Sequence, residues 1–94
     1  MGARENKVET YLDSEVEKHG GITRKWVSPG RAGVPDRIVF YQGAVFFVEA
    51  KTTDGKTSSA QRREMSRLEF HGARCFVVYG HSGVDAFIEI MVNA

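Results

Sequence analysis

Apolar positions follow a helical period near the N-terminus and form short continuous runs in the middle of the chain. Val8, Leu12 and Val16 recur every four residues, which predicts a helix over residues 4–19 that a glycine pair ends. The next apolar residues, within residues 22–28, have the length and composition of a short strand. The chain therefore begins with a helix followed by a strand.

Two apolar, β-branched and aromatic runs, residues 37–41 and 44–48, flank Gln42 and Gly43. This pattern predicts a β-hairpin with a two-residue loop, in which the glycine supplies a positive φ and the numbers of paired residues sum to 85. Both faces of this hairpin are apolar, so we expect it in the middle of a sheet with helices on each face.

Charged residues gather at the open end of the predicted hairpin. The same register places Asp36 opposite Glu49, and Lys51 shares a face with Glu49 because side chains alternate along a strand. Opposed carboxylates destabilise a strand pair unless a cation lies between them. That cation is either Lys51 or a divalent metal such as magnesium or manganese, whereas solvated charges at ordinary strand ends are the alternative interpretation.

Ser58 or Ser59 caps a predicted helix that runs to about residue 71. Gln61 shares the inward face of this helix with Met65. A polar side chain on an inward face needs a partner, which is either a backbone carbonyl or a water close to an active site.

A last strand is predicted over residues 73–79, and Ser82 is expected to cap a final helix. Ile90 and Val92 widen the apolar surface of that helix, so it packs either on the core alone or also on a second subunit. The order α-β-β-β-α-β-α indicates one α/β domain over residues 1–94.

The composition excludes several classes of protein. The chain has one cysteine, so an intrachain disulfide is impossible. No apolar run is long enough to span a membrane, and the N-terminus lacks the apolar core of a signal peptide. We therefore expect a cytoplasmic protein with no membrane partner.

The net charge is only +1, but the charges are unevenly distributed. Residues 18–74 contain eleven Lys or Arg and five Asp or Glu, whereas the last twenty residues contain no Lys or Arg. This distribution suggests a surface for a polyanion and a separate packing surface. Arg31 lies in a loop rich in glycine and proline, where it is free to meet a phosphate.

The ordered combination of Pro35-Asp36, Glu49-Ala50-Lys51 and Gln61 resembles the PD-(D/E)XK nuclease superfamily. Residues 25–38 (KWVSPGRAGVPDRI) and 47–52 (FVEAKT) resemble the stand-alone VRR-NUC domains of phages and bacteria. The resemblance implies a restriction-endonuclease-like fold, with a central mixed β-sheet flanked by helices.

The resemblance also implies a role for each matching residue. Asp36, Glu49 and the carbonyl of Ala50 would bind magnesium or manganese. Lys51 would position the attacking water, help to deprotonate it and stabilise charge on the phosphate. Gln61 would orient water or a neighbouring ligand.

Members of the superfamily also use an acidic residue on the first helix. Val8-Glu9 resembles the Val-Glu of archaeal Holliday junction resolvases, so Glu9 is expected to be a catalytic residue and a metal ligand, with Glu5 as the rival. Four residues are expected to bind nucleic acid: Lys25, Ser28, Arg31 and Arg37.

The function implied by the resemblance is metal-dependent, structure-specific hydrolysis of DNA phosphodiesters. A homodimer that cuts four-way (Holliday) junctions is the leading form, because a two-fold dimer supplies paired cuts. The alternatives are a monomeric flap or nicking nuclease and a non-catalytic nucleic-acid-binding module. The expected partner is branched DNA, with no small-molecule cofactor, in the cytoplasm of a bacterial or phage-infected cell.

Overall fold

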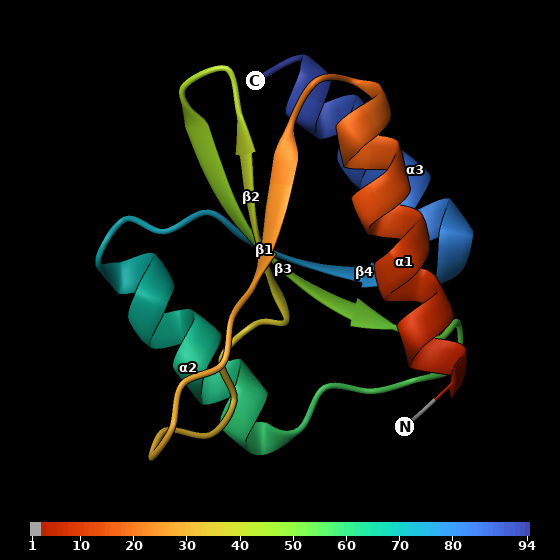
Figure 1. Cartoon of the computed structure of the whole chain (residues 1–94). Helices are drawn as coiled ribbons and strands as arrows, with labels where there is room; N and C mark the ends of the chain where they lie inside the picture. Colours follow the sequence, from red (N-terminus) through yellow and green to blue (C-terminus); the bar gives the residue numbers. More distant parts are fainter. Residues whose placement is uncertain (1–2) are drawn as a thin grey trace.

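The computed structural model describes residues 3–94, with side chains from residue 6 onward. The rival acid Glu5 therefore lies outside the described side chains. Seven elements follow one another along the chain (Figure 1): α1 (Ala3–Lys18), β1 (Ile22–Lys25), β2 (Arg37–Tyr41), β3 (Ala44–Lys51), α2 (Ser59–Phe70), β4 (Cys75–Tyr79) and α3 (Gly80–Val92). This is the predicted α-β-β-β-α-β-α order.

The four strands form one mixed sheet in the order β1-β2-β3-β4. β2 is antiparallel to both β1 and β3, whereas β4 runs parallel to β3 because α2 carries the chain back across the sheet. The mixed sheet flanked by helices confirms the predicted fold class.

The predicted hairpin register is confirmed. Tyr41 pairs with Ala44 and Arg37 pairs with Val48, so paired numbers sum to 85 along β2 and β3. Gln42 and Gly43 have φ of 46° and 84°, and a two-residue loop with two positive φ angles matches the twist of the strands that it joins.

One face of the sheet is closed by α1 and α3, which lie side by side over it (Figure 1). Phe46 of β3 is fully buried and meets Phe87 of α3 edge-on, with ring centroids 5.4 Å apart. The core beneath the two helices also contains Leu12, Val16, Val39, Val48, Val84 and Met91. Here Val39 of β2 and Phe46 and Val48 of β3 are fully protected from water.

The opposite face carries only α2 (Figure 1), and burial there is incomplete. Phe40 and Val45, near the hairpin loop, remain 38% and 39% exposed. The expectation that helices bury both faces of the hairpin is therefore wrong at this end of the sheet. The physical reason is that α2 has twelve residues and does not extend over the hairpin loop.

Several predicted boundaries also differ, including the start of the last strand, which lies at Cys75 rather than residue 73. The final helix begins at Gly80, directly after β4, because Gly80 has a φ of 66° that turns the chain sharply. Ser82 lies within the first turn of α3, and the N-cap residue Tyr79 makes no side-chain cap hydrogen bond. The first strand ends at Lys25 rather than residue 28. No helix in residues 3–94 is long and apolar enough to cross a membrane.

Candidate active site

The predicted acidic pair lies where β2 separates from β3. Antiparallel pairing ends at Arg37 and Val48, whereas β3 continues beside β4 as far as Lys51. Asp36 immediately precedes β2 and spans the gap, because its Oδ2 accepts a hydrogen bond of 3.0 Å from the backbone N–H of Ala50. Its backbone carbonyl also accepts a 3.0 Å hydrogen bond from the N–H of Trp26. Asp36 is therefore fixed to both neighbouring strands.

Glu49 has two hydrogen-bonding partners, and both contact the same carboxylate oxygen. Gln61 Nε2 lies 2.7 Å and Lys51 Nζ lies 3.1 Å from Oε2. The side chain of Glu49 is 3% exposed. Its second oxygen, Oε1, is buried without a hydrogen-bond partner among the described residues. A buried oxygen without a partner is costly, so this one is available to a ligand that enters the site.

The environment of Glu49 favours its neutral form in the free protein. Burial, and after it the nearby charge of Asp36, raise the pKa of the Glu49 carboxyl to about 7. The ammonium of Lys51 and the backbone amide of Asp36 oppose this change. The site thus holds two carboxylates whose repulsion Lys51 only partly offsets.

Gln61 is oriented by the first turn of α2. Its side-chain oxygen accepts a 2.9 Å hydrogen bond from the N–H of Ser58, and the Ser58 hydroxyl accepts a 3.1 Å bond from the N–H of Gln61. This capping box leaves the amide NH2 of Gln61 directed at Glu49. Gln61 therefore points inward as expected, and its partner there is the carboxylate of Glu49. The S-x-x-Q spacing carried the signal for this capping box in the sequence.

The loop before Asp36 packs directly on the same turn. Gly33 has a φ of 91°, and a Cβ atom there would lie 2.5 Å from the carbonyl oxygen of Ala60. Only glycine allows this approach of two backbones. The close packing connects the position of Asp36 to that of Gln61.

The first-helix acid Glu9 faces Arg37 on the other face of the sheet. The Glu9 carboxylate lies 3.2 Å from Arg37 Nη1, while Asp13 holds the same guanidinium through hydrogen bonds of 2.9 and 3.1 Å. Burial raises the pKa of Glu9, and the charge of Asp36 raises it further. Asp13 was missed by the sequence reasoning, although it lies one helical turn after Glu9.

The four residues expected to bind nucleic acid occupy different places. Lys25 lies near enough to Glu9 to lower its pKa. Ser28 and Arg31 belong to the loop before β2, where the Ser28 carbonyl accepts a 3.1 Å bond from the Arg31 N–H. Arg37 points to α1, where Glu9 and Asp13 hold it. Arg31 and Arg37 therefore lie in different places, Arg31 in the loop before β2 and Arg37 against α1.

The donor set fits a hard divalent cation. Among the described side chains, those of residues 6–94, no group of three or more His, Cys, Asp or Glu is arranged to hold a metal, so Glu9 does not form such a group with Asp36 and Glu49. Magnesium commonly uses one or two protein carboxylates and takes its other ligands from water and phosphate. Asp36 and the free Oε1 of Glu49, with the carbonyl of Ala50, match that requirement.

A mixed sheet with Asp36, Glu49 and Lys51 at its split end is the arrangement of a PD-(D/E)XK nuclease domain. The chain is 47% identical over 76 residues to a protein named "Putative nuclease p44" from Acyrthosiphon pisum secondary endosymbiont phage 1, covering 80% of this chain and 82% of the relative.

A solved structure described as "VRR_NUC domain" is 35% identical, with a TM-score of 0.84 over 94% of this chain and 97% of that chain. A second, described as "VRR_NUC domain protein", has a TM-score of 0.78 at 20% identity, over 99% of this chain and 91% of that chain, and shows the fold alone. No family model matches the sequence. The chain belongs to the VRR-NUC family and is a nuclease domain.

Proposed function

We propose that this domain is a magnesium- or manganese-dependent endonuclease that hydrolyses phosphodiesters in branched DNA. The observation that carries the proposal is the buried Oε1 of Glu49, which has no hydrogen-bond partner among the described residues although Asp36 lies close enough to raise the pKa of Glu49. Asp36, Glu49 and the carbonyl of Ala50 are the proposed metal ligands. When bound, the metal would activate water and stabilise charge on the phosphate.

Lys51 is proposed to act on the developing charge of the substrate. Its side chain is 10% exposed, and its ammonium lies 3.1 Å from Glu49 Oε2, at the end of β3. A cation held in a largely dehydrated site interacts strongly with a phosphate oxygen that gains charge in the transition state. Lys51 is also proposed to orient the attacking water and to help remove its proton.

Gln61 is proposed to keep Glu49 in its productive orientation. Its amide cannot rotate freely, because its oxygen is held by the Ser58 N–H while its nitrogen donates to Glu49. Glu9 is proposed as the first-helix acid of the site, since its carboxyl interacts electrostatically with Asp36. Lys25, Ser28, Arg31 and Arg37 are the proposed contacts to the DNA backbone.

We propose that a homodimer performs paired cuts in four-way junctions. Val84, Phe87, Ile88 and Met91 of α3 are used by the core, but Ile90 and Tyr79 remain 44% and 39% exposed on α3 and at the end of β4. These two side chains flank a cavity of about 340 Å³ between β4 and α3. An apolar edge of this kind suits a second copy of the chain.

The test is cleavage of a labelled four-way junction, a flap, a duplex and a single strand, with magnesium and with a chelator, beside sedimentation of the protein with and without DNA. Paired symmetric cuts by a particle of twice 10.5 kDa support the proposal. Cutting of flaps alone by a persistent monomer supports a flap or nicking nuclease. DNA binding without metal-dependent cutting of any substrate supports a non-catalytic binding module.

A further inference from the structure

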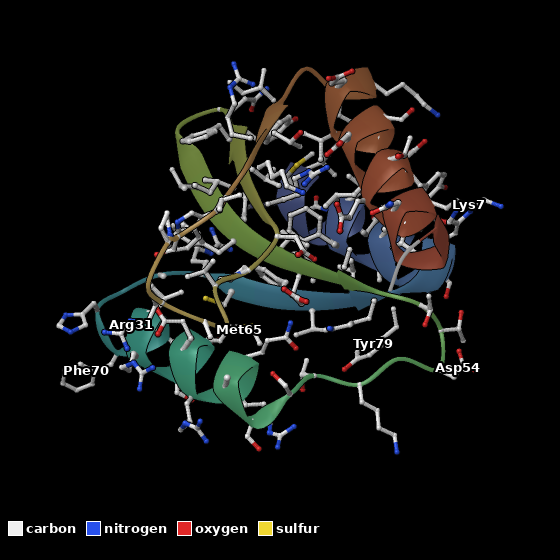
Figure 2. The ribbon with its side chains drawn as sticks, turned by 60° about the horizontal axis from the view of Figure 1, so that its bottom comes forward. Lys7, Arg31, Asp54, Met65, Phe70 and Tyr79 are labelled. Carbon is white, nitrogen blue, oxygen red and sulfur yellow. The ribbon has the colours of Figure 1, made fainter. Side chains whose placement is uncertain are left out.

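The C-terminal half of α2 carries an exposed aromatic side chain that the core does not use. Phe70 is 85% exposed, and it meets the neighbouring ring of His71 edge-on with centroids 5.2 Å apart. Figure 2 shows Arg31, from the loop before β2, beside Phe70 at this end of α2. A single exposed apolar side chain is common on protein surfaces, so the significance of Phe70 depends on the groups that surround it.

Phe70 borders a cavity of about 550 Å³ that lies between α2 and Arg31 and has largely apolar walls. Two cations line it, Arg31 and Arg67, and one carboxylate, Glu64, is paired with Arg67 at 2.9 Å. Arg31 makes no ion pair within the described side chains, so a positive charge remains available there. The combination of a free guanidinium and an open aromatic ring is complementary to a nucleotide, which presents a phosphate and a base face.

We infer that this cavity, named here the Phe70 cavity and lined by Arg31, Arg67, Leu68, Phe70 and His71, binds a single-stranded segment of the DNA substrate. An unpaired base stacks on Phe70 and Arg31 holds an adjacent phosphate. Single-stranded DNA is the occupant because a base inside a duplex has both faces covered by its neighbours. The inference rests on the proposed nuclease function.

The geometry connects the cavity to the catalytic carboxylates. Phe70 lies nine residues after Gln61 on α2, which corresponds to about 14 Å along the helix axis. The loop that supplies Arg31 touches the other end of α2 through Gly33 and then leads into Asp36. About four stacked nucleotides cover this distance at about 3.4 Å each. A single-stranded branch of the substrate, such as a flap, can therefore occupy the cavity while its junction-proximal phosphate lies at Glu49.

The first experiment measures binding of a fluorescein-labelled oligothymidine of fifteen nucleotides by anisotropy, with chelator present so that no cleavage occurs. Phe70→Ala should weaken binding about tenfold, the loss expected for one stacked base. Phe70→Trp should retain binding, whereas Phe70→Leu should not, because leucine keeps the apolar surface but has no aromatic face. Val45→Ala, a truncation of another exposed apolar residue near the hairpin loop, should leave binding unchanged.

The second experiment locates the stacked base. A single abasic site is moved along the flap of a cleavable substrate, and one position about four nucleotides from the cut should slow cleavage as much as Phe70→Ala does. At that position, Phe70→Ala combined with the abasic site should slow cleavage no more than either change alone, because both remove the same contact.

Two results overturn the inference while the nuclease function stands: unchanged oligonucleotide binding by Phe70→Ala, or full binding by Phe70→Leu, which would mean an apolar contact with a protein or a second copy of the chain. If the unaltered protein cuts no DNA with magnesium and does not bind the oligonucleotide, the proposed function fails as well. Glu49→Ala separates the two sites, since it should abolish cutting and keep oligonucleotide binding.

Discussion

Under α1 and α3, the side chains of Val39, Phe46 and Val48 are fully buried. On the other face of the same sheet, by contrast, Glu49 and Lys51 form part of a charged site. Buried apolar residues and residues of the charged face alternate along β2 and β3, so consecutive residues belong in turn to the core and to the site. The apolar face is closed by two helices and gains its stability from burial. The charged face is left partly open by α2, and it keeps a buried oxygen that has no hydrogen-bond partner in the part of the chain that the structure describes.

Asp36 and Arg37 show the same division in two consecutive residues. Arg37 points to α1 and is held by Glu9 and Asp13, while Asp36 points to Ala50 and Glu49. The ion pairs of Arg37 attach β2 to α1 close to the site, so the closed face supports the open one. The comparison predicts that substitutions on the two faces have different consequences for stability and for cleavage.

The largest effect is expected for Glu49→Ala. Cleavage of DNA should fall by at least about 10³-fold, because a proposed metal ligand and the partner of Lys51 are both lost. DNA binding should remain. The rate is measured under single-turnover conditions, with magnesium binding followed by calorimetry, and Glu89→Ala on the exposed side of α3 serves as the matched control. A rate within tenfold of the unaltered protein would remove Glu49 from the chemistry.

Phe46→Ala and Phe40→Ala form a matched pair across the sheet. Phe46 is fully buried against Phe87, so its truncation should lower the free energy of unfolding by about 3–5 kcal/mol. Phe40 is 38% exposed on the open face, and its truncation should cost less than about 1.5 kcal/mol. Urea denaturation measures both values. Equal losses would mean that the open face is covered in solution, for example by a second copy of the chain.

The raised pKa of Glu49 predicts a pH dependence of stability. The folded-state pKa of about 7 exceeds the ordinary value of 4.5, so the folded protein holds the proton more tightly than the unfolded chain. As the pH rises from about 4.5 to 7, the unaltered protein should lose up to about 3 kcal/mol of unfolding free energy relative to Glu49→Gln, and the difference should then level off. Denaturation at several pH values measures this difference. A difference that is constant with pH would contradict the raised pKa.

Lys51→Ala should reduce cleavage about 10²-fold while magnesium affinity changes little, because the ammonium acts mainly in the transition state. Lys56→Ala, in the polar loop after β3, removes the same charge without touching the site and is the matched control. Single-turnover rates and calorimetric metal binding are compared in the two variants. Equal losses of metal affinity and rate in Lys51→Ala would make Lys51 a structural residue.

Much of the site was predictable because it depends on local geometry. The hairpin register follows from a two-residue loop, and it placed Asp36 beside Glu49 with Lys51 on the same face. The helical period placed Gln61 inward. The roles of Arg37 and Glu9 were harder to foresee, because an ion pair between a helix and a strand depends on how the two pack. Phe70 carried no signal in the sequence, since an apolar residue near a helix end resembles part of the core.

The sequence by itself determined the element order, the strand pairing of the hairpin and the residues that form its acidic end. These features arise from alternation, turn chemistry and helical period, which act over short distances along the chain. The tertiary structure decided that α1 and α3 cover one face, that α2 leaves Phe40 and Val45 exposed, and that Oε1 of Glu49 has no hydrogen-bond partner among the side chains described. Those outcomes depend on how far each helix reaches across the sheet, which no local pattern specifies.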